Sequence, residues 1–144
     1  EIFKADYCLI LANDIQEPYN SVEVRLKEFQ QRGAGIVTIP TDIQTQKVHR
    51  YLAGNFMISK ECFNKIGYFT TEWDNSYGAV DLNYTVRATE AGFKCINAPA
   101  QAKHLDNGDT AYGFSKKQAL KETWPKFKEW ERIKNKSLYL PYQQ

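Results

Sequence analysis

Carboxylate side chains gather in the segment 67–93, which is the part of this sequence best suited to chemistry. Glu72 and Asp74 stand in a polar stretch, and Asp81 begins a helical pattern that ends at Gly92. Carboxylates on a loop that leads into a helix N-terminus stay accessible, and the helix dipole favours their ionised form. Ionised carboxylates bind hard cations and accept protons. The alternative for Asp81 is a structural role, in which it caps or charges the first turn of its own helix.

Two further polar residues that could bind a ligand or a metal ion lie outside that segment. Asp14 follows the apolar run 7–11, which predicts a strand buried on both faces of a sheet. Open α/β sheets bind ligands at the carboxyl ends of their strands, although Asn-Asp is also common turn chemistry. His104 lies in the short predicted strand 101–105. Taken alone, it is more typical of a hydrogen-bonded loop histidine than of a metal ligand.

Aromatic residues make up 14% of the chain, which is enough for some of them to line a groove. Trp73 and Tyr77 lie in the acidic loop, where an exposed ring face would suit a sugar ring. Packing into the core is the alternative for both residues.

Composition indicates one globular domain without a nucleic-acid or membrane-spanning signature. The chain has 144 residues, of which 42% are hydrophobic, and its net charge of +2 is too small to indicate a nucleic-acid partner. No apolar run approaches the roughly 20 residues of a membrane span. Cys8, Cys62 and Cys95 are isolated from one another, so we expect reduced thiols and a cytoplasmic setting. Because the chain starts at Glu1 and enters a strand almost at once, we expect it to be a piece of a longer protein.

Alternating strand and helix patterns predict an α/β fold. Capping signals predict four helices. The first runs from the capping pair Asn20 and Glu23 to Gly33, and the second covers 60–66, between Ser59 and Gly67. The third runs from Asp81 to Gly92, and the fourth begins at the capping pair Ser115 and Gln118 and is broken or kinked by Pro125. The first of these helices lies between two predicted strands, which suggests a βαβ unit. Gly54 suggests a close approach of a ligand or another backbone within its strand. The predicted strands are 7–11, 35–40, 51–58, 94–98 and 101–105.

The segment from Phe114 onward is basic. A solvated helix face is the ordinary interpretation, and a surface that contacts anionic lipid or an anionic acceptor is the alternative. Trp124, Phe127, Trp130 and Ile133 recur at helical spacing and predict a docking face. The basic residues are Lys116, Lys117, Lys121, Lys126, Lys128, Arg132, Lys134 and Lys136.

Taken in order, these features resemble the second half of a family 2-type glycosyltransferase with the GT-A fold. YCLILANDIQ resembles the strand that leads to the DxD metal motif of that family, and YLAGNFMISKECFNKIGYFTTEW resembles its conserved central segment. VDLNYTVRATEAGFKCINAP resembles the helix that carries the acidic base motif, and AKHLDNGDT resembles the stretch with a metal-binding histidine. The resemblance covers nearly the whole chain, and its specificity comes from the order and spacing of the motifs.

The resemblance implies a partial GT-A, Rossmann-like mixed sheet flanked by helices, in a single domain over 1–144 that lacks the N-terminal nucleotide-binding strands. It implies metal-dependent, inverting transfer of a sugar from a nucleotide sugar to a hydroxyl of a saccharide, lipid-linked or protein acceptor. A divalent ion, Mn²⁺ or Mg²⁺, would neutralise the diphosphate, and a carboxylate would take the acceptor proton. The implied roles are metal binding for Asp14 and His104, catalysis for Asp81 and Asp74, and substrate binding for Gly54, Asn55, Glu72, Trp73 and Tyr77.

The sequence departs from the family pattern at two places. Gly78 and Ala79 occupy the positions of the acidic pair, so that Asp81 alone remains there, and Ala12 replaces the first aspartate of DxD. Asp74 or Glu72 would have to substitute if Asp81 only caps its helix. These departures keep a second hypothesis open, in which the chain is a non-catalytic module that binds a saccharide or a protein.

Overall fold

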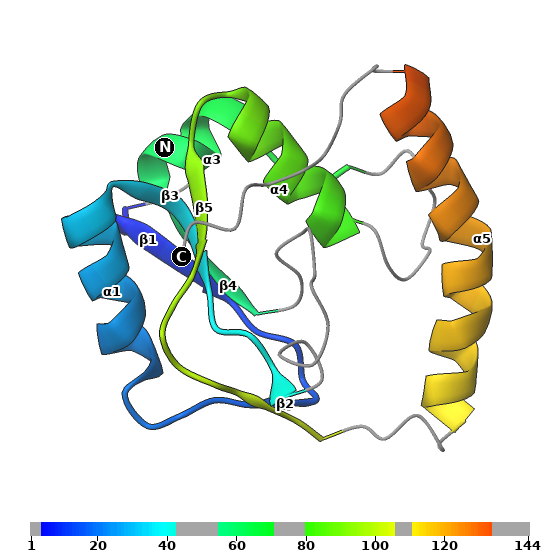
Figure 1. Ribbon diagram of the computed structural model, residues 1–144, viewed down its shortest axis with the longest axis horizontal. Coiled ribbons are helices and arrows are strands. Elements are labelled where there is room, and N and C mark those ends of the chain that lie inside the picture. Colours follow the sequence, from blue (N-terminus) through cyan, green and yellow to red (C-terminus); the bar gives the residue numbers. More distant parts are fainter. Residues whose placement is uncertain (1–3, 43–54, 71–79, 106–110, 134–144) are drawn as a thin grey trace.

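The computed structural model describes residues 4–42, 55–70, 80–105 and 111–133. Within these ranges the chain forms a mixed α/β fold, with a four-stranded mixed sheet, a two-stranded ribbon and four helices (Figure 1). The elements are β1 (Tyr7–Ile10), β2 (Ile15–Gln16), α1 (Ser21–Arg32), β3 (Ala34–Thr38), β4 (Phe56–Ser59), α3 (Lys60–Ile66), α4 (Val80–Glu90), β5 (Lys94–Asn97), β6 (Lys103–His104) and α5 (Ala111–Ile133).

The strands of the sheet run in the order β1-β4-β3-β5. β4 is antiparallel to both β1 and β3, while β3 and β5 are parallel. Since β1 and β3 both oppose β4, they are parallel to each other, as a strand–helix–strand unit requires. The predicted unit is therefore present, with β4 inserted between its two strands.

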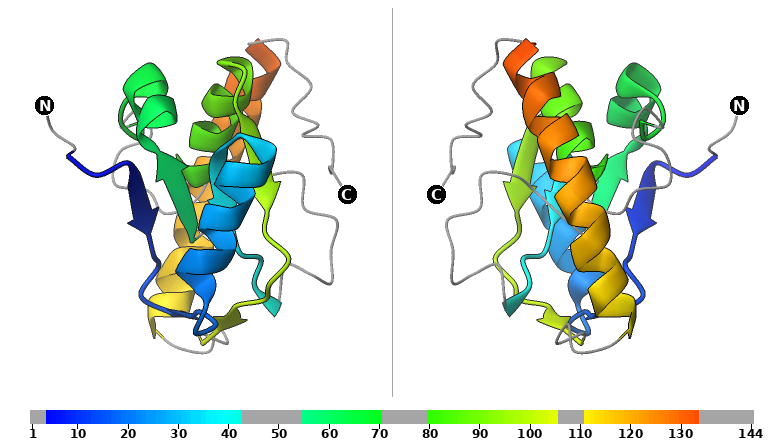
Figure 2. Two further views of the ribbon diagram at one scale, coloured as in Figure 1. Left: turned by 90° about the vertical axis from the view of Figure 1, so that its left-hand side faces the viewer. Right: turned by 90° about the vertical axis from the view of Figure 1, so that its right-hand side faces the viewer.

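Helix α1 covers one face of the sheet and helices α3 and α4 cover the other (Figure 2), and each face has its own core. The apolar side of α1, centred on Phe29, packs with Val37 and Met57 on one face. On the other face Ile36 and Ile58 pack with Tyr84 of α4 and with residues of α3. Neighbouring residues of a strand point to opposite faces, which explains why Ile36 and Val37 belong to different cores although both are fully buried.

The long helix α5 lies against α4 rather than against the sheet (Figure 1). Phe127 is fully buried between Leu82 and Val86 of α4, and Trp130 packs against the same cluster. Trp124, which the sequence pattern also assigned to this docking face, is 41% exposed. The predicted docking face is therefore correct for Phe127 and Trp130 and only partly correct for Trp124, whose ring packs on that of Phe127 with centroids 5.6 Å apart. The side chain of Ile133 lies outside the described part of the structure.

The helix ends follow their sequence signals closely. Ser59 caps α3, because its Oγ accepts the backbone N–H of Cys62 at 3.2 Å. Gly33 ends α1 with φ 61°, a left-handed conformation that favours glycine, and its N–H donates to the carbonyl of Phe29. Gly92 has a positive φ directly after α4. The stop signals at these glycines are confirmed.

Several finer predictions are wrong. Asn20 makes no side-chain capping bond. Helix α5 begins at Ala111, and Ser115 lies within it, where its hydroxyl donates to the carbonyl of Ala111. The same helix continues through Pro125, so the predicted break is wrong, while the predicted kink stays a prediction. Pro125 is exposed, so the carbonyl that loses its backbone partner there lies on the solvent side.

Two strand predictions also change. β1 is an edge strand, and its four residues are half-buried instead of buried on both faces. β3 starts one residue before the predicted segment 35–40 and ends two residues before its end. For the predicted strand 51–58, β4 confirms the last part, and residues 51–54 lie outside the described ranges.

Candidate functional site

The pairing of β2 with β6 brings Asp14 and His104 together. His104 stands opposite Ile15 in this ribbon, and the N–H of Leu105 donates to the Asp14 carbonyl at 2.7 Å. The imidazole Nε2 of His104 then lies 3.5 Å from Oδ2 of Asp14. These are the two residues that the sequence resemblance names as metal ligands, and the backbone of the ribbon places them side by side.

A second aspartate fixes the strand that carries the histidine. Oδ1 of Asp42 accepts the backbone N–H of His104 at 3.0 Å. The N–H of Asp42 in turn donates to the carbonyl of Ala102, next to a bridge between Thr41 and Ala102. The end of the β3 segment therefore positions β6, and with it His104.

Lys116 from α5 completes the cluster. Its Nζ forms an ion pair with Oδ2 of Asp14, the same oxygen that faces His104. The side chains are enclosed, with exposed fractions of 10% for Lys116, 14% for Asp14 and 23% for His104. Sequence reasoning counted Lys116 only as one of a set of basic residues. Its spacing of seven residues before Thr123 and eleven before Phe127, both buried, places it on the inner face of α5.

The spacing of Asp14 and His104 suits two ligands of one divalent ion. Two ligands at right angles on an ion with bonds of about 2.1 Å lie about 3 Å apart, close to the 3.5 Å between Oδ2 of Asp14 and Nε2 of His104. Within the described ranges, no group of three or more His, Cys, Asp or Glu side chains is arranged to hold a metal. The pair therefore fits an ion that takes its remaining ligands from phosphate and water, which is how proteins commonly bind Mg²⁺.

Asp81 lies in the first turn of α4, as the sequence predicts. Its Oδ1 accepts the N–H of Leu82 at 2.9 Å, so the carboxylate interacts with the start of its own helix. This contact matches the structural alternative for Asp81, and it also holds the side chain at the helix N-terminus. The other residues of the implied substrate and base sites, Gly54, Glu72, Trp73, Asp74 and Tyr77, lie outside the described residues, as do Gly78 and Ala79.

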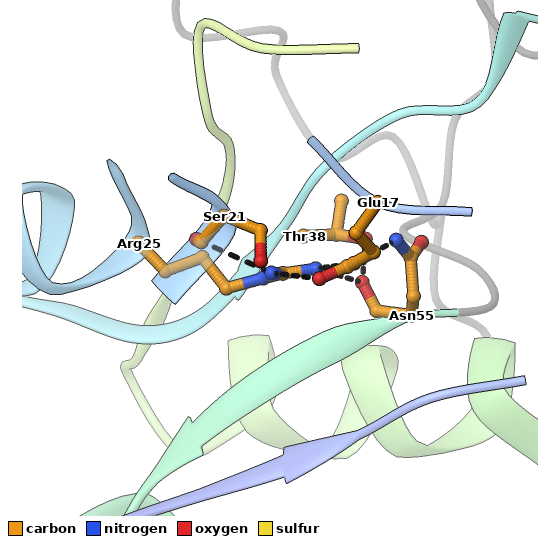
Figure 3. Close-up of polar contacts among 5 residues, drawn as sticks. All are labelled: Glu17, Ser21, Arg25, Thr38 and Asn55. Atoms are coloured by element: carbon orange, nitrogen blue, oxygen red, sulfur yellow. Dashed lines mark hydrogen bonds and ion pairs between the residues drawn. The ribbon is translucent and has the colours of Figure 1, made fainter. Parts of the chain in front are cut away.

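Asn55, which the resemblance assigns to substrate binding, belongs to a buried polar network instead of the Asp14 cluster (Figure 3). Its Nδ2 donates to Glu17, and its carbonyl accepts bonds from Thr38 Oγ1 at 2.6 Å and from Arg25 Nη2 at 3.3 Å. Within the described ranges, Oδ1 of Asn55 and Nε of Arg25 are buried without a hydrogen-bond partner.

Glu17 and Arg25 form the centre of this network. Burial by itself raises the pKa of the Glu17 carboxyl, but hydrogen bonds from Arg25 and Asn55 and the charge of Arg25 outweigh it, so that the pKa is lowered. The sequence predicted no role for Glu17. The available signal was the position of Arg25 four residues before Phe29, on the apolar side of its helix.

The three cysteines are free thiols, as predicted, and Cys62 is fully buried. Burial raises the pKa of the Cys62 thiol to about 12 and that of Cys95 to about 11. Such thiols are weak nucleophiles at neutral pH, so neither residue extends the candidate site.

Each described helix is too short or too polar to cross a lipid bilayer. No protein-family model, curated protein or solved structure matches this chain.

Proposed function

We propose that the chain is part of a glycosyltransferase domain of the GT-A type, which transfers a sugar from a nucleotide sugar to an acceptor hydroxyl. One observation carries the proposal. Asp14 and His104 lie far apart in the sequence, and the motif order assigned both to one metal site. Their side chains lie 3.5 Å apart in the fold, at the end of a ribbon of which the sequence predicted one strand, 101–105, but neither the partner strand β2 nor the pairing.

The site supports this chemistry through its own residues. Asp14 and His104 would hold Mn²⁺ or Mg²⁺, and the ion would supply positive charge to the leaving diphosphate. Asp42 holds the His104 backbone in place, which orients the imidazole toward Asp14. Asp81, or Asp74, would take the proton from the acceptor hydroxyl as it attacks the sugar, with inversion at the anomeric carbon.

The exposed side of α5 offers a surface on which an acceptor could bind. Phe114, Lys117, Lys121, Trp124 and Lys128 follow one another at intervals of three and four residues, and so share one exposed stripe of the helix. Phe114 is 72% exposed and Trp124 is 41% exposed. Lysines interleaved with exposed aromatic rings match an anionic lipid surface, so we propose that the helix contacts a membrane that carries a lipid-linked acceptor.

A test of the transferase function uses thermal unfolding of the full-length protein with a series of nucleoside diphosphates and Mn²⁺. We expect one diphosphate to raise the melting temperature only when Mn²⁺ is present, and Asp14→Ala to abolish the shift. Asp6→Ala is the matched control, because Asp6 is exposed. A melting temperature that no diphosphate and metal pair changes would contradict the transferase and favour the non-catalytic binding module.

A further inference from the structure

We propose that the Lys116 ammonium group holds the place of a divalent ion on Asp14 and moves to the diphosphate when the ion binds, an inference that rests on the proposed function. Lys116 would then be a diphosphate-binding residue that the resemblance does not assign. Its state would depend on whether the metal is present.

One carboxylate oxygen of Asp14 has two partners. Oδ2 of Asp14 forms the ion pair with Lys116 Nζ and also faces Nε2 of His104. A divalent ion shared by Asp14 and His104 would need that oxygen. The ammonium group and the ion therefore compete for one ligand atom.

Burial decides what happens to the displaced lysine. The Lys116 side chain is 10% exposed, and an enclosed charge is stabilised by a partner of opposite charge. If an ion takes Asp14, the ammonium group loses this ion pair, and a second anion nearby would replace it. The diphosphate that the proposed function brings to the ion is such an anion.

The charges of the cluster support the same exchange. Asp14, Asp42 and Lys116 together carry one negative charge, so a divalent ion added alone leaves a net positive charge in an enclosed site. A diphosphate group compensates for that excess. We therefore expect the metal and the diphosphate each to strengthen the binding of the other, since such coupling is reciprocal.

The long, flexible side chain of Lys116 would allow its ammonium group to move from Asp14 to the diphosphate without a change of fold. The ammonium group sits on a flexible four-carbon stem and donates three hydrogen bonds, so it can change partners by rotation of its side chain. The backbone of Lys116 stays in α5, which Phe127 anchors to α4. A rigid helix with a flexible side chain is suited to this role.

The experiment measures Mn²⁺ binding by electron paramagnetic resonance, with Mn²⁺ alone and with inorganic pyrophosphate as the diphosphate probe. The signal is corrected for the complex that Mn²⁺ forms with pyrophosphate in solution. We expect Lys116→Met to bind Mn²⁺ alone at least tenfold more tightly than the unmodified chain. Lys126→Met, a change at an exposed lysine of α5 outside the stripe, is expected to leave the affinity unchanged.

Pyrophosphate separates the exchange from a purely structural ion pair. In the unmodified chain it should strengthen Mn²⁺ binding at least tenfold, and in Lys116→Met this gain should be largely lost. Unchanged Mn²⁺ affinity in Lys116→Met would overturn the proposal. If that variant does not fold, equal Mn²⁺ affinity of the unmodified chain with and without pyrophosphate would overturn it as well.

The outcome also distinguishes this inference from the proposed function. A full-length protein that turns over a nucleotide sugar, while Lys116→Met leaves Mn²⁺ binding unchanged, would contradict the exchange alone. Coupled binding of Mn²⁺ and pyrophosphate without turnover of any nucleotide sugar would support the exchange and contradict the transferase.

Discussion

The guanidinium group of Arg25 is fully buried and donates to both carboxylate oxygens of Glu17, with the Nη1–Oε2 distance at 2.7 Å. We expect Arg25→Met to lower the free energy of unfolding by about 3–5 kcal/mol, because it leaves the Glu17 carboxylate enclosed without its cation. Chemical denaturation measures the loss. Arg32→Met is the comparison, because the Arg32 side chain is 32% exposed and its removal lets water reach the Glu28 carboxylate, so it should cost only about 0.5–1 kcal/mol. Equal losses in the two variants would contradict a special role for the buried pair.

Acid should weaken the same pair. The pKa of Glu17 is lowered in the folded chain from its ordinary value of 4.5, so the unfolded chain binds the proton more readily. The stability that Glu17 contributes is therefore present above pH 4.5 and is lost as the pH falls through the lower folded-state pKa. Melting temperatures of the unmodified chain and of Glu17→Gln should differ by a constant amount above pH 4.5 and converge below it. A gap that widens on acidification would contradict the lowered pKa.

Gly35 in β3 lies against the side chain of Phe93, which leaves no room for a methyl group at this position. A Cβ at this position would lie 2.6 Å from Cβ of Phe93. We expect Gly35→Ala to lower the free energy of unfolding by about 1–3 kcal/mol through overpacking, as measured by denaturation. Gly33→Asn is the control, because nothing lies within 4 Å of a Cβ there and asparagine tolerates the left-handed backbone. A milder effect at Gly35 than at Gly33 would show that the Phe93 contact yields easily.

Cys62 should resist alkylation in the folded chain. Its thiol is fully buried and has a pKa of about 12, so at neutral pH its thiolate fraction is about a thousandfold below that of a thiol with the ordinary value of 9.0. We expect iodoacetamide to label Cys62 only as fast as the chain unfolds, with mass spectrometry as the measurement. The denatured chain, in which all thiols react, is the control. Labelling of Cys62 faster than unfolding would indicate local opening around α3.

The exposed stripe of α5 should bind anionic vesicles. We expect Lys121→Glu to weaken cosedimentation with vesicles that contain phosphatidylserine by roughly tenfold or more, since each lysine near such a surface contributes about 1 kcal/mol. Lys126→Glu makes the same charge change outside the stripe and should have a smaller effect. Binding should also fall with added salt and be absent with neutral vesicles. Equal effects of the two substitutions would favour attraction by overall charge over a defined surface.

The sequence predicts local structure best where one residue decides it. Ser59, Gly33 and Gly92 mark helix ends through their own side chain or backbone, so their signals need no knowledge of the rest of the chain. The ribbon of β2 and β6 has two residues in each strand, too few for any hydrophobic pattern, and β2 was not predicted.

The candidate site shows the same limit. The order of motifs predicted that Asp14 and His104 share a site, yet nothing near either residue indicates Lys116, because that contact depends on how α5 packs on α4. Arg25 was overlooked for a related reason. Its place on the apolar face of α1 was a signal in the sequence, but only the fold identifies Glu17 as its partner.

Helix α5 contributes to the candidate site on one side and to the molecular surface on the other. Its inner side places Lys116 on Asp14, while its outer side presents Trp124 and Lys121 to the surroundings. Because one helix carries both sides, a partner that shifts α5 from the outer stripe would also move Lys116 relative to Asp14. The proposed docking at the surface and the proposed exchange of charge inside the site would then be coupled.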